Sequence, residues 1–310
     1  MSAAKGGGPA AVAVVFAYHD VGVRCLKTLL DAGLKVALVV THRDDPGEQI
    51  WFASVAKLAA ENGVPSVFAE DLTADALLEK VRSFSPDFIF SFYYRRMLPL
   101  VVLQAARLGA FNMHGSLLPK YRGRVPVNWA VLKGETETGA TLHEMVEKPD
   151  AGRIVDQHAV PIGPDDLAVD VFRKVTDAAE KVMRRSLPGL IDGSAILKTQ
   201  DLANGSYFGG RRPEDGRIDW SRPASEVHNL VRAVAPPYPG AFTAFEGGTL
   251  RIHRTKLEPA LEPALEPAPE PHLKASAGTD AVYCAGTELF ARCGDGRVLR
   301  LLEYIKEPSP

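Results

Sequence analysis

The sequence predicts an α/β fold, in which a doubly wound sheet with helices on both faces is followed by a smaller open β-barrel domain. Two observations indicate this fold. Through the first 92 residues, short apolar segments alternate with longer helical segments, as in βαβ units. After residue 241, short alternating segments follow one another with no helix between them, which is typical of a small barrel.

The first half of the chain shows the alternation element by element. Strands are expected at 13–17, 36–40, 65–68 and 88–92, and helices at 20–30, 49–61 and 74–84. Asp20 is expected to cap the first helix and Gly33 to end it. The turn at 17–20 lacks the glycine pattern that admits a pyrophosphate, so a nicotinamide dehydrogenase is disfavoured. His19 is interpreted as a turn residue.

The middle of the chain is expected to extend the sheet with strands at 109–114, 139–145 and 153–160. Pro126 suits the first turn of a helix. A long helix is expected to start after Asp165 or Asp166 and to end near Ser186, before Pro188. His143 is interpreted as a buried, hydrogen-bonded histidine.

Domain boundaries follow from composition and pattern. Residues 1–11 are expected to form a glycine-rich flexible tail, residues 12–205 the larger domain and residues 206–310 the barrel domain. A proline- and glutamate-rich repeat at 257–275 is expected to form a loop within the barrel.

Composition limits the possible functions. The chain has 36 Lys and Arg against 38 Asp and Glu, a net charge of −2, and no long basic run, so nucleic-acid binding is disfavoured. No apolar stretch approaches the roughly 20 residues needed to span a bilayer. The three cysteines suit a reducing cytoplasm, and their odd number argues against a disulfide framework. Neither a paired His/Cys spacing nor an acidic cluster predicts a metal site.

Three residues have the side chains that acyl transfer to an amine requires. Asn112 can donate to a developing oxyanion, His114 can move a proton, and Asp150 can orient the imidazole. Positions 112 and 114 are two apart, so on a strand their side chains share one face. A purely structural interpretation stays open, because a histidine after an apolar strand is often a satisfied core residue and an aspartate before Ala-Gly is often a turn former.

The chain resembles the formyltetrahydrofolate-dependent formyltransferases. The resemblance rests on residues 111–126 (FNMHGSLLPKYRGRVP), 134–139 (GETETG) and 150–152 (DAG), and it extends from 14–20 (VVFAYHD) through 90–95 (FSFYYR) to 231–234 and 239–242. It is strongest to the members that formylate UDP-4-amino-4-deoxy-L-arabinose. It implies a Rossmann-like formyltransferase domain and an OB-like open barrel. It also implies that His114 is the acid/base, that Asn112 stabilises the tetrahedral state and that Asp150 raises the pKa of the histidine.

The same resemblance implies the co-substrate and its contacts. The formyl donor would be 10-formyltetrahydrofolate, with no metal. The donor-binding positions that it implies are Arg96, Met97, Leu98, Arg124, Val146, Glu147, Lys148, Pro149 and Asp150. Position 96 departs from the family pattern, which has histidine there, although a backbone contact would survive that change. Between Arg122 and Arg124, Gly123 is expected to allow a turn that presents both guanidinium groups.

The implied reaction is attack of a neutral sugar amine on the formyl carbon, in a cytoplasmic enzyme whose product would serve lipid A modification and polymyxin resistance. Larger members carry a nucleotide-sugar dehydrogenase domain as well, so either a separate dehydrogenase/decarboxylase is a partner here or this chain is part of a longer protein, and the sequence leaves both open. Three alternatives stay open: methionyl-tRNA formyltransferase, formylation of another nucleotide-linked amino sugar, and a non-catalytic folate- or nucleotide-binding module. Arg211 and Arg212 are candidates for a diphosphate contact.

Overall fold

The computed structural model describes residues 11–258 and 281–308. The expected tail at 1–11 lies almost wholly outside these ranges, and so does most of the expected loop at 257–275. The chain forms two compact units. Unit 1 comprises Met1–Pro126, Thr138–Val160 and Phe172–Gly209, and unit 2 comprises Val127–Glu137, Pro161–Val171 and Gly210–Pro310.

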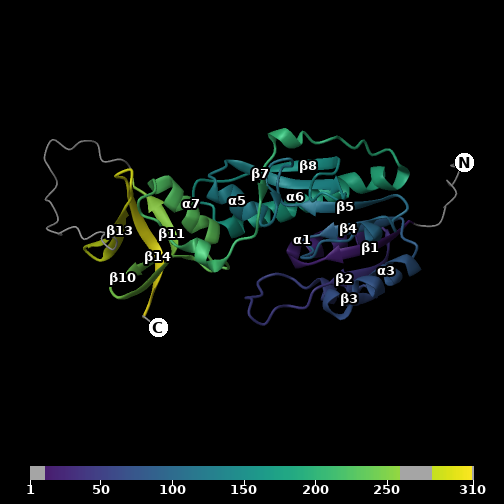
Figure 1. Ribbon diagram of the computed structural model, residues 1–310, viewed down its shortest axis with the longest axis horizontal. Coiled ribbons are helices and arrows are strands. Elements are labelled where there is room, and N and C mark those ends of the chain that lie inside the picture. The colour runs from purple at the N-terminus through teal and green to yellow at the C-terminus, as the bar shows by residue number, and fades with distance from the viewer. Residues whose placement is uncertain (1–10, 259–280, 309–310) are drawn as a thin grey trace, which may run out of the picture. The chain divides into compact units, whose positions relative to one another are not determined.

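Unit 1 is built on a mixed sheet of seven strands in the order β3-β2-β1-β4-β5-β7-β8 (Figure 1). The strands are β1 (Val12–Ala17), β2 (Lys35–Thr41), β3 (Ser66–Phe68), β4 (Phe88–Phe92), β5 (Gly109–His114), β7 (Glu137–Glu144) and β8 (Ile154–Pro161). The first five strands pair in parallel, and β7 runs antiparallel to β5. A short parallel pair joins β6 (Arg122–Gly123) to β9 (Tyr207–Phe208). Because β1, β4 and β5 are parallel to one another in the seven-stranded sheet, their carboxyl ends meet at one edge of it.

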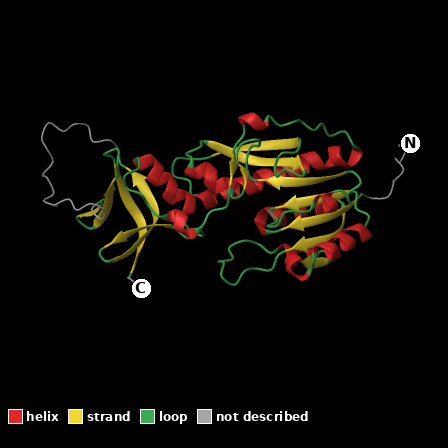
Figure 2. Ribbon diagram, in the orientation of Figure 1, coloured by secondary structure: helices red, strands yellow, loops and turns green. Residues whose placement is uncertain are grey.

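Helices cover both faces of this sheet, as the α/β prediction requires (Figure 2). They are α1 (His19–Asp31), α2 (Val55–Glu61), α3 (Ala74–Ser83), α4 (Leu100–Leu103) and α6 (Ala168–Asp192), with single turns η1 (Ala69–Asp71) and η2 (Leu202–Asn204). Val14, Phe16 and Ile89 join α3 and α4 in one apolar cluster. The alternate residues of β1 point to the other face. Helix α1 packs on β1 and is joined to α6 by ion pairs from Arg24 to Asp177 and Glu180.

Two expected helices have different bounds in the structure. Helix α2 begins at Val55 instead of residue 49, because the hydroxyl of Ser54 accepts the N–H of Lys57 and the rings of Trp51 and Phe52 pack on His19. Helix α6 continues through Pro188 to Asp192. Apolar residues on both sides of that proline, among them Met183, Leu187 and Leu190, are buried, which favours continuation of the helix.

The sequence pattern predicts Asp20 as the cap of α1, and this prediction is wrong. The N-cap is Tyr18, which makes no capping hydrogen bond through its side chain. The carboxylate of Asp20 instead accepts the N–H of Ala53 at 2.8 Å, which ties the loop after β2 to the first turn of α1.

Unit 2 contains an open antiparallel sheet in the order β10-β11-β14-β13-β12, which agrees with the predicted barrel-like domain. Its elements are α5 (Pro126–Leu132), η3 (Pro213–Gly216), α7 (Ala224–Val234), β10 (Ala241–Phe245), β11 (Gly248–Leu257), β12 (Val282–Ala285), β13 (Glu288–Arg292) and β14 (Val298–Glu307). Helix α7 packs on β11. Buried Val227 and Val231 of α7 and Leu250 and Ile252 of β11 supply apolar residues to this core.

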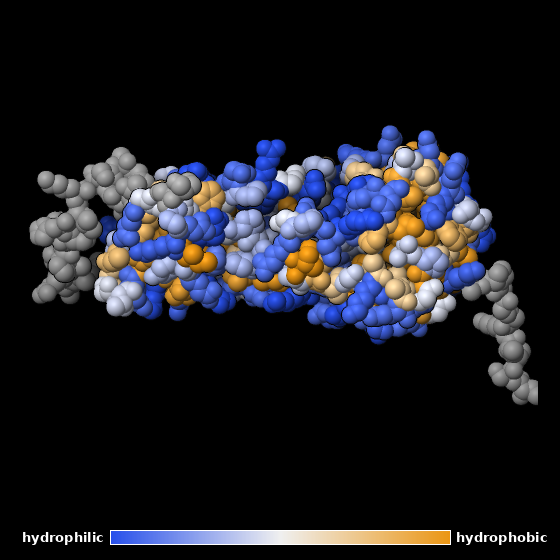
Figure 3. All heavy atoms as spheres, turned by 90° about the horizontal axis from the view of Figure 1, so that it is seen from below, coloured by the Kyte–Doolittle hydropathy of each residue, from blue (hydrophilic) through white to orange (hydrophobic). Residues whose placement is uncertain are grey.

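None of the helices in the described ranges is both long enough and apolar enough to cross a membrane. On the face drawn in Figure 3, apolar side chains occur in small groups among polar ones.

Candidate active site

Two strands bring polar side chains together at the sheet edge where β5 ends. Asn112 and His114 lie on β5, and the antiparallel partner β7 places His143 opposite Asn112 and Thr141 opposite His114. Asp150 follows β7 in a loop and has a left-handed backbone with φ of 52°. Since aspartate is one of the few residues that tolerate this conformation, the turn there suits its sequence.

The Asp150 carboxylate lies between two imidazole rings. Its Oδ1 is 3.6 Å from Nδ1 of His114 and 3.4 Å from Nε2 of His143, and its Oδ2 accepts the backbone N–H of Gly123 at 2.8 Å. Burial alone would raise the pKa of this carboxyl group, but His114, His143 and the Gly123 N–H outweigh it and hold the pKa well below its usual range. Asp150 is therefore ionised at neutral pH.

Hydrogen bonding fixes the tautomer of His114. Its Nε2 is 2.8 Å from the carbonyl oxygen of Tyr121, and because a carbonyl only accepts, Nε2 carries the proton. Burial lowers the pKa of His114, and the nearby Asp150 opposes that effect without cancelling it. The ring is thus neutral near pH 7, and Nδ1, the nitrogen that faces Asp150, is the one able to take up a proton.

His143 is part of this arrangement, although the sequence interpretation treated it only as a buried, bonded residue. It is buried, and its Nδ1 is 2.9 Å from the Glu144 carbonyl oxygen. Its Nε2 also lies 3.1 Å from Nδ2 of Asn112. We define the Asp150 network as Asn112, His114, His143 and Asp150. The strand at 139–145 was expected, but its pairing with β5 was not, and the pairing is what brings His143 to Asn112.

The segments expected to bind the formyl donor are brought partly together. Leu98, after β4, and Met145, after β7, pack against the same apolar cluster. Close to these residues, Met97 is 68% exposed and Val146 is 37% exposed. Arg96 donates from its guanidinium to the Ala69 carbonyl at 2.8 Å and lies 3.5 Å from Glu70. Glu147 and Lys148 are exposed, and Pro149 is partly buried.

The two arginines that flank Gly123 do not face the same surroundings. Arg122 is buried, and its Nε donates to the Ser206 carbonyl at 3.4 Å. Arg124 is exposed, and its backbone N–H donates to Phe208. The expectation that the turn presents both guanidinium groups was wrong, because Arg122 is buried where β6 pairs with β9, whereas Arg124 is exposed just after that strand.

Aromatic rings surround His19 at the same edge of the sheet. Its ring stacks on Phe52 with centroids 3.9 Å apart and meets the rings of Trp51, Phe172 and Tyr93 at 4.6 Å, 4.7 Å and 6.4 Å. Burial lowers the pKa of His19 to about 3, with a smaller contribution from the charge of Arg95. His19 therefore stays neutral at physiological pH.

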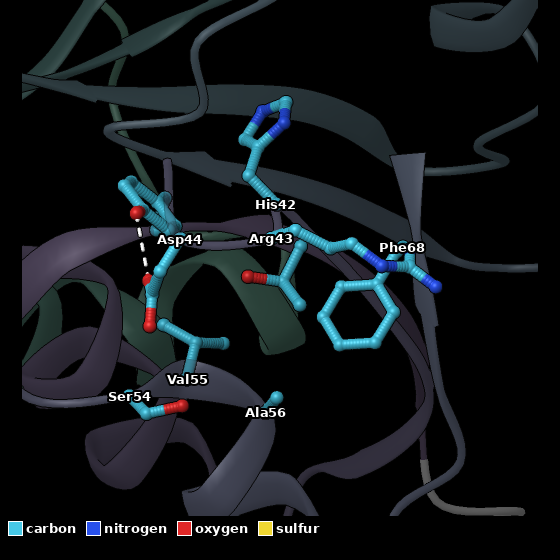
Figure 4. Close-up of a pocket in the computed structure, with 9 residues that line it drawn as sticks. His42, Arg43, Asp44, Ser54, Val55, Ala56 and Phe68 are labelled. Carbon is cyan, nitrogen blue, oxygen red and sulfur yellow. Dashed lines mark hydrogen bonds between the residues drawn. The ribbon is translucent and has the colours of Figure 1, made fainter. Parts of the chain in front are cut away.

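A separate pocket of about 160 Å³ lies at the carboxyl end of β2 (Figure 4). Within it, the Tyr18 hydroxyl donates to Asp44 at 2.8 Å, and the guanidinium of Arg43 lies over the ring of Phe68. Its lining consists of Tyr18, Thr41, His42, Arg43, Asp44, Ser54, Val55, Ala56 and Phe68. None of the residues expected to bind the formyl donor lines this pocket.

In unit 2, Arg211 lies with its guanidinium 5.0 Å from the centre of the Trp129 ring and donates to the Asp215 carbonyl. The backbone N–H of Arg212 donates to the Asp215 carboxylate. Through the described part of the chain, no three His, Cys, Asp or Glu side chains are arranged to hold a metal ion.

Comparison with solved structures places this fold among formyltransferases. An N-formyltransferase from Helicobacter canadensis, in complex with folinic acid and dTDP-3-aminofucose, is 20% identical with a TM-score of 0.72, over 96% of this chain and 100% of that one. WlaRD, a sugar 3N-formyl transferase crystallised in the presence of dTDP and 5-N-formyl-THF, is 20% identical with a TM-score of 0.69, over 97% of this chain and 98% of that one.

HypX from Aquifex aeolicus, in complex with tetrahydrofolic acid, is 19% identical with a TM-score of 0.62 over 96% of this chain, which matches 46% of that larger protein. At these identities the likenesses show a shared fold.

Family models extend the comparison to the sequence. Residues 11–187 match the model of the formyl transferase family, and residues 211–308 match the model of the formyl transferase C-terminal domain. The first match alone covers more than half of the chain. The chain therefore belongs to the formyl transferase family and is a transferase of formyl groups.

Proposed function

We propose that this enzyme transfers the formyl group of 10-formyltetrahydrofolate to the amino group of a nucleotide-linked sugar, and that the sugar is UDP-4-amino-4-deoxy-L-arabinose. The observation that carries the proposal is the Asp150 network, in which an amide donor, a neutral imidazole and a mostly buried carboxylate meet at the end of β5. These are the groups that amine formylation needs, since the formyl carbon is already electrophilic and the proton of the attacking amine must be moved.

The proposed reaction needs no covalent enzyme intermediate. The neutral amine attacks the formyl carbon, a C–N bond forms, and the carbonyl oxygen becomes an oxyanion that the Asn112 amide stabilises. Nδ1 of His114 takes the proton from the attacking nitrogen, and Asp150 stabilises the imidazolium across 3.6 Å. Transfer of that proton to N10 of the folate lets the C–N10 bond break, which releases tetrahydrofolate and the formamide.

The donor-binding surface in this proposal consists of residues 96–98, residues 146–150 and the exposed side chain of Arg124. Support comes from the two segments that pack on one apolar cluster and from the exposed side chains of Met97 and Val146, which suit a flat heteroaromatic ring. The exposed guanidinium of Arg124 suits the negatively charged glutamate of a folate.

Support for a nucleotide-linked amino sugar comes from the neighbours. The Helicobacter canadensis protein was solved with dTDP-3-aminofucose and folinic acid, and WlaRD with dTDP and 5-N-formyl-THF. The choice of a UDP-linked pentose rests on the sequence resemblance. With it go a cytoplasmic reaction, a product destined for lipid A modification and polymyxin resistance, and a separate nucleotide-sugar dehydrogenase/decarboxylase as a partner.

The test is formyl transfer from 10-formyltetrahydrofolate, measured with UDP-4-amino-4-deoxy-L-arabinose, a dTDP-linked amino sugar and methionyl-tRNA in parallel. His114→Ala is the blank, and His158→Ala on β8 is the matched control outside the Asp150 network. Turnover of the UDP-sugar by the wild type and the control, with loss in the blank, supports the proposal. Turnover of another acceptor alone keeps the chemistry and overturns the sugar assignment. Folate binding without turnover of any acceptor means that the chain is a binding module.

A further inference from the structure

We propose that His143 is a positioning residue that fixes the orientation of the Asn112 amide, so that an N–H rather than the carbonyl oxygen faces the formyl oxygen. The kinetic consequence of this orientation rests on the proposed function, whereas the orientation itself concerns only the contact between these two side chains. Asn112 lies on β5 and His143 directly opposite on β7.

A hydrogen bond to the backbone fixes the tautomer of His143. Its Nδ1 lies 2.9 Å from the carbonyl oxygen of Glu144. Because a carbonyl oxygen accepts and never donates, Nδ1 carries the proton. In the neutral ring, Nε2 is then an unprotonated acceptor.

The acceptor on His143 in turn fixes the orientation of the Asn112 amide. Its Nδ2 lies 3.1 Å from this acceptor, so an amide N–H donates to His143. The reverse orientation would place the amide oxygen against an unprotonated nitrogen, where two acceptors repel each other. His143 thus selects one of the two orientations that a terminal amide can adopt. The second N–H of the same amide remains to donate to an oxyanion.

The pair formed by Asn112 and His143 is held rigidly. His143 is 2% exposed, and its ring is held from the other side by the Glu144 carbonyl. The antiparallel pairing of β5 with β7 sets the separation of the two side chains. An oxyanion donor is effective when it is held in place before the reaction, because no free energy is then spent on reorienting it.

Asp150 explains why the tautomer matters. Its Oδ1 lies 3.4 Å from Nε2 of His143, and the ring of His114 lies 6.3 Å from that of His143, centroid to centroid. A proton on Nε2 would turn His143 toward an ion pair with Asp150 and would remove the acceptor for Asn112. Only the tautomer with its proton on Nδ1 therefore orients the amide.

The experiment compares two substitutions of His143. His143→Asn retains a donor near Nδ1 and lacks the acceptor at Nε2, whereas His143→Gln places an amide oxygen near the position of Nε2. We expect kcat in His143→Asn to fall about 10–10²-fold, less than the roughly 10²–10³-fold loss from removing an oxyanion donor, with KM for both substrates nearly unchanged. His143→Gln should recover most of kcat.

A double variant separates positioning from general damage. In an Asn112→Ala background, His143→Asn should cost little more, since the amide that it orients is absent. Full additivity of the two losses, an equal loss in His143→Gln, or a change confined to KM would overturn the inference. Unchanged thermal unfolding of both single variants excludes misfolding as the cause of a kinetic loss.

Nitrogen-15 NMR of the wild-type enzyme tests the geometry without turnover. We expect His143 to show a protonated Nδ1 and an unprotonated Nε2 at neutral pH, and the side-chain amide of Asn112 to shift in His143→Asn. An Nε2-protonated ring or an imidazolium at pH 7 would contradict the inference. Absence of turnover in the wild type with every acceptor would overturn the proposed function alone, since the NMR result stands independently.

Discussion

The backbone N–H of Gly123 donates a 2.8 Å hydrogen bond to Oδ2 of Asp150, which leaves Oδ1 to lie between His114 and His143. This bond connects the short strand β6 to the loop after β7, 27 residues later in the chain. One carboxylate oxygen is thus used to hold the group in place, and the other is directed at the two rings. Because its Oδ2 is bonded to Gly123, Asp150 can keep a fixed distance from His114 and His143 although it lies in a loop.

Replacing Asp150 with asparagine should separate charge from shape. Asparagine tolerates the left-handed φ of 52° and keeps the size of the side chain. Loss of the charge should lower kcat by about 10²–10⁴-fold, the usual contribution of a proton-transfer group. Asp150 raises the pKa of His114 against the effect of burial, so the acid limb of the pH–rate profile should move to lower pH in the variant. A limb that stays in place would contradict the proposed link between the two residues.

Gly115→Ala tests the packing directly after His114. A Cβ at this position would collide with the hydroxyl oxygen of Tyr93 and lie 3.1 Å from its Cζ. We expect a loss of about 1–3 kcal/mol in the free energy of unfolding, as for other overpacked sites. Tyr93→Phe removes the colliding oxygen, so Gly115→Ala should cost clearly less in that background. Equal costs in the two backgrounds, measured by denaturant titration, would show that the contact is not responsible.

His19 should make the protein sensitive to acid. Its pKa is about 3 in the folded protein against an ordinary value of 6.5. Between these values the unfolded chain binds a proton at this ring that the folded chain does not, so the ring's contribution to stability is complete above pH 6.5 and decreases as pH falls toward 3.

His19→Asn keeps a residue that tolerates the left-handed φ of 67° and removes the titration. The free energy of unfolding of the wild type should therefore fall more steeply between pH 6.5 and pH 4 than that of the variant. Parallel pH dependences of the two proteins would be inconsistent with a buried neutral His19.

Arg232 should be important for the stability of unit 2. Its guanidinium is buried and donates to the carbonyls of Gly163 and Asp166 at 3.1 Å and to the Asn229 amide oxygen at 2.8 Å. Arg232→Met removes the hydrogen bonds that the guanidinium donates to these acceptors, and we expect a loss of about 1–3 kcal/mol in the free energy of unfolding, seen as a lower Tm. Arg222→Met, which breaks an exposed pair with Glu226, is the matched control and should cost about 0.5 kcal/mol or less. Similar losses in both variants would show that burial of Arg232 contributes little.

Local pattern was sufficient for most of the fold. Strands such as β4 and β5 are short apolar runs bounded by turn residues, and hydrophobic periodicity predicts such elements without knowledge of their neighbours. The elements with wrong bounds depend on distant contacts. The start of α2 is set by aromatic packing on His19, and the end of α6 by burial of residues beyond Pro188. Tertiary packing there outweighs the local preference.

The sequence by itself determined the fold class, the family and the candidate residues Asn112, His114 and Asp150, because these depend on residue type, spacing and local pattern. Only the tertiary structure decided that β7 runs antiparallel beside β5, so that His143 meets Asn112 and Asp150 reaches both rings. Strand pairing is a long-range choice, made by the burial of whole sheet faces rather than by any one residue. The protonation states follow from it, since burial and neighbouring charge exist only after the chain has folded.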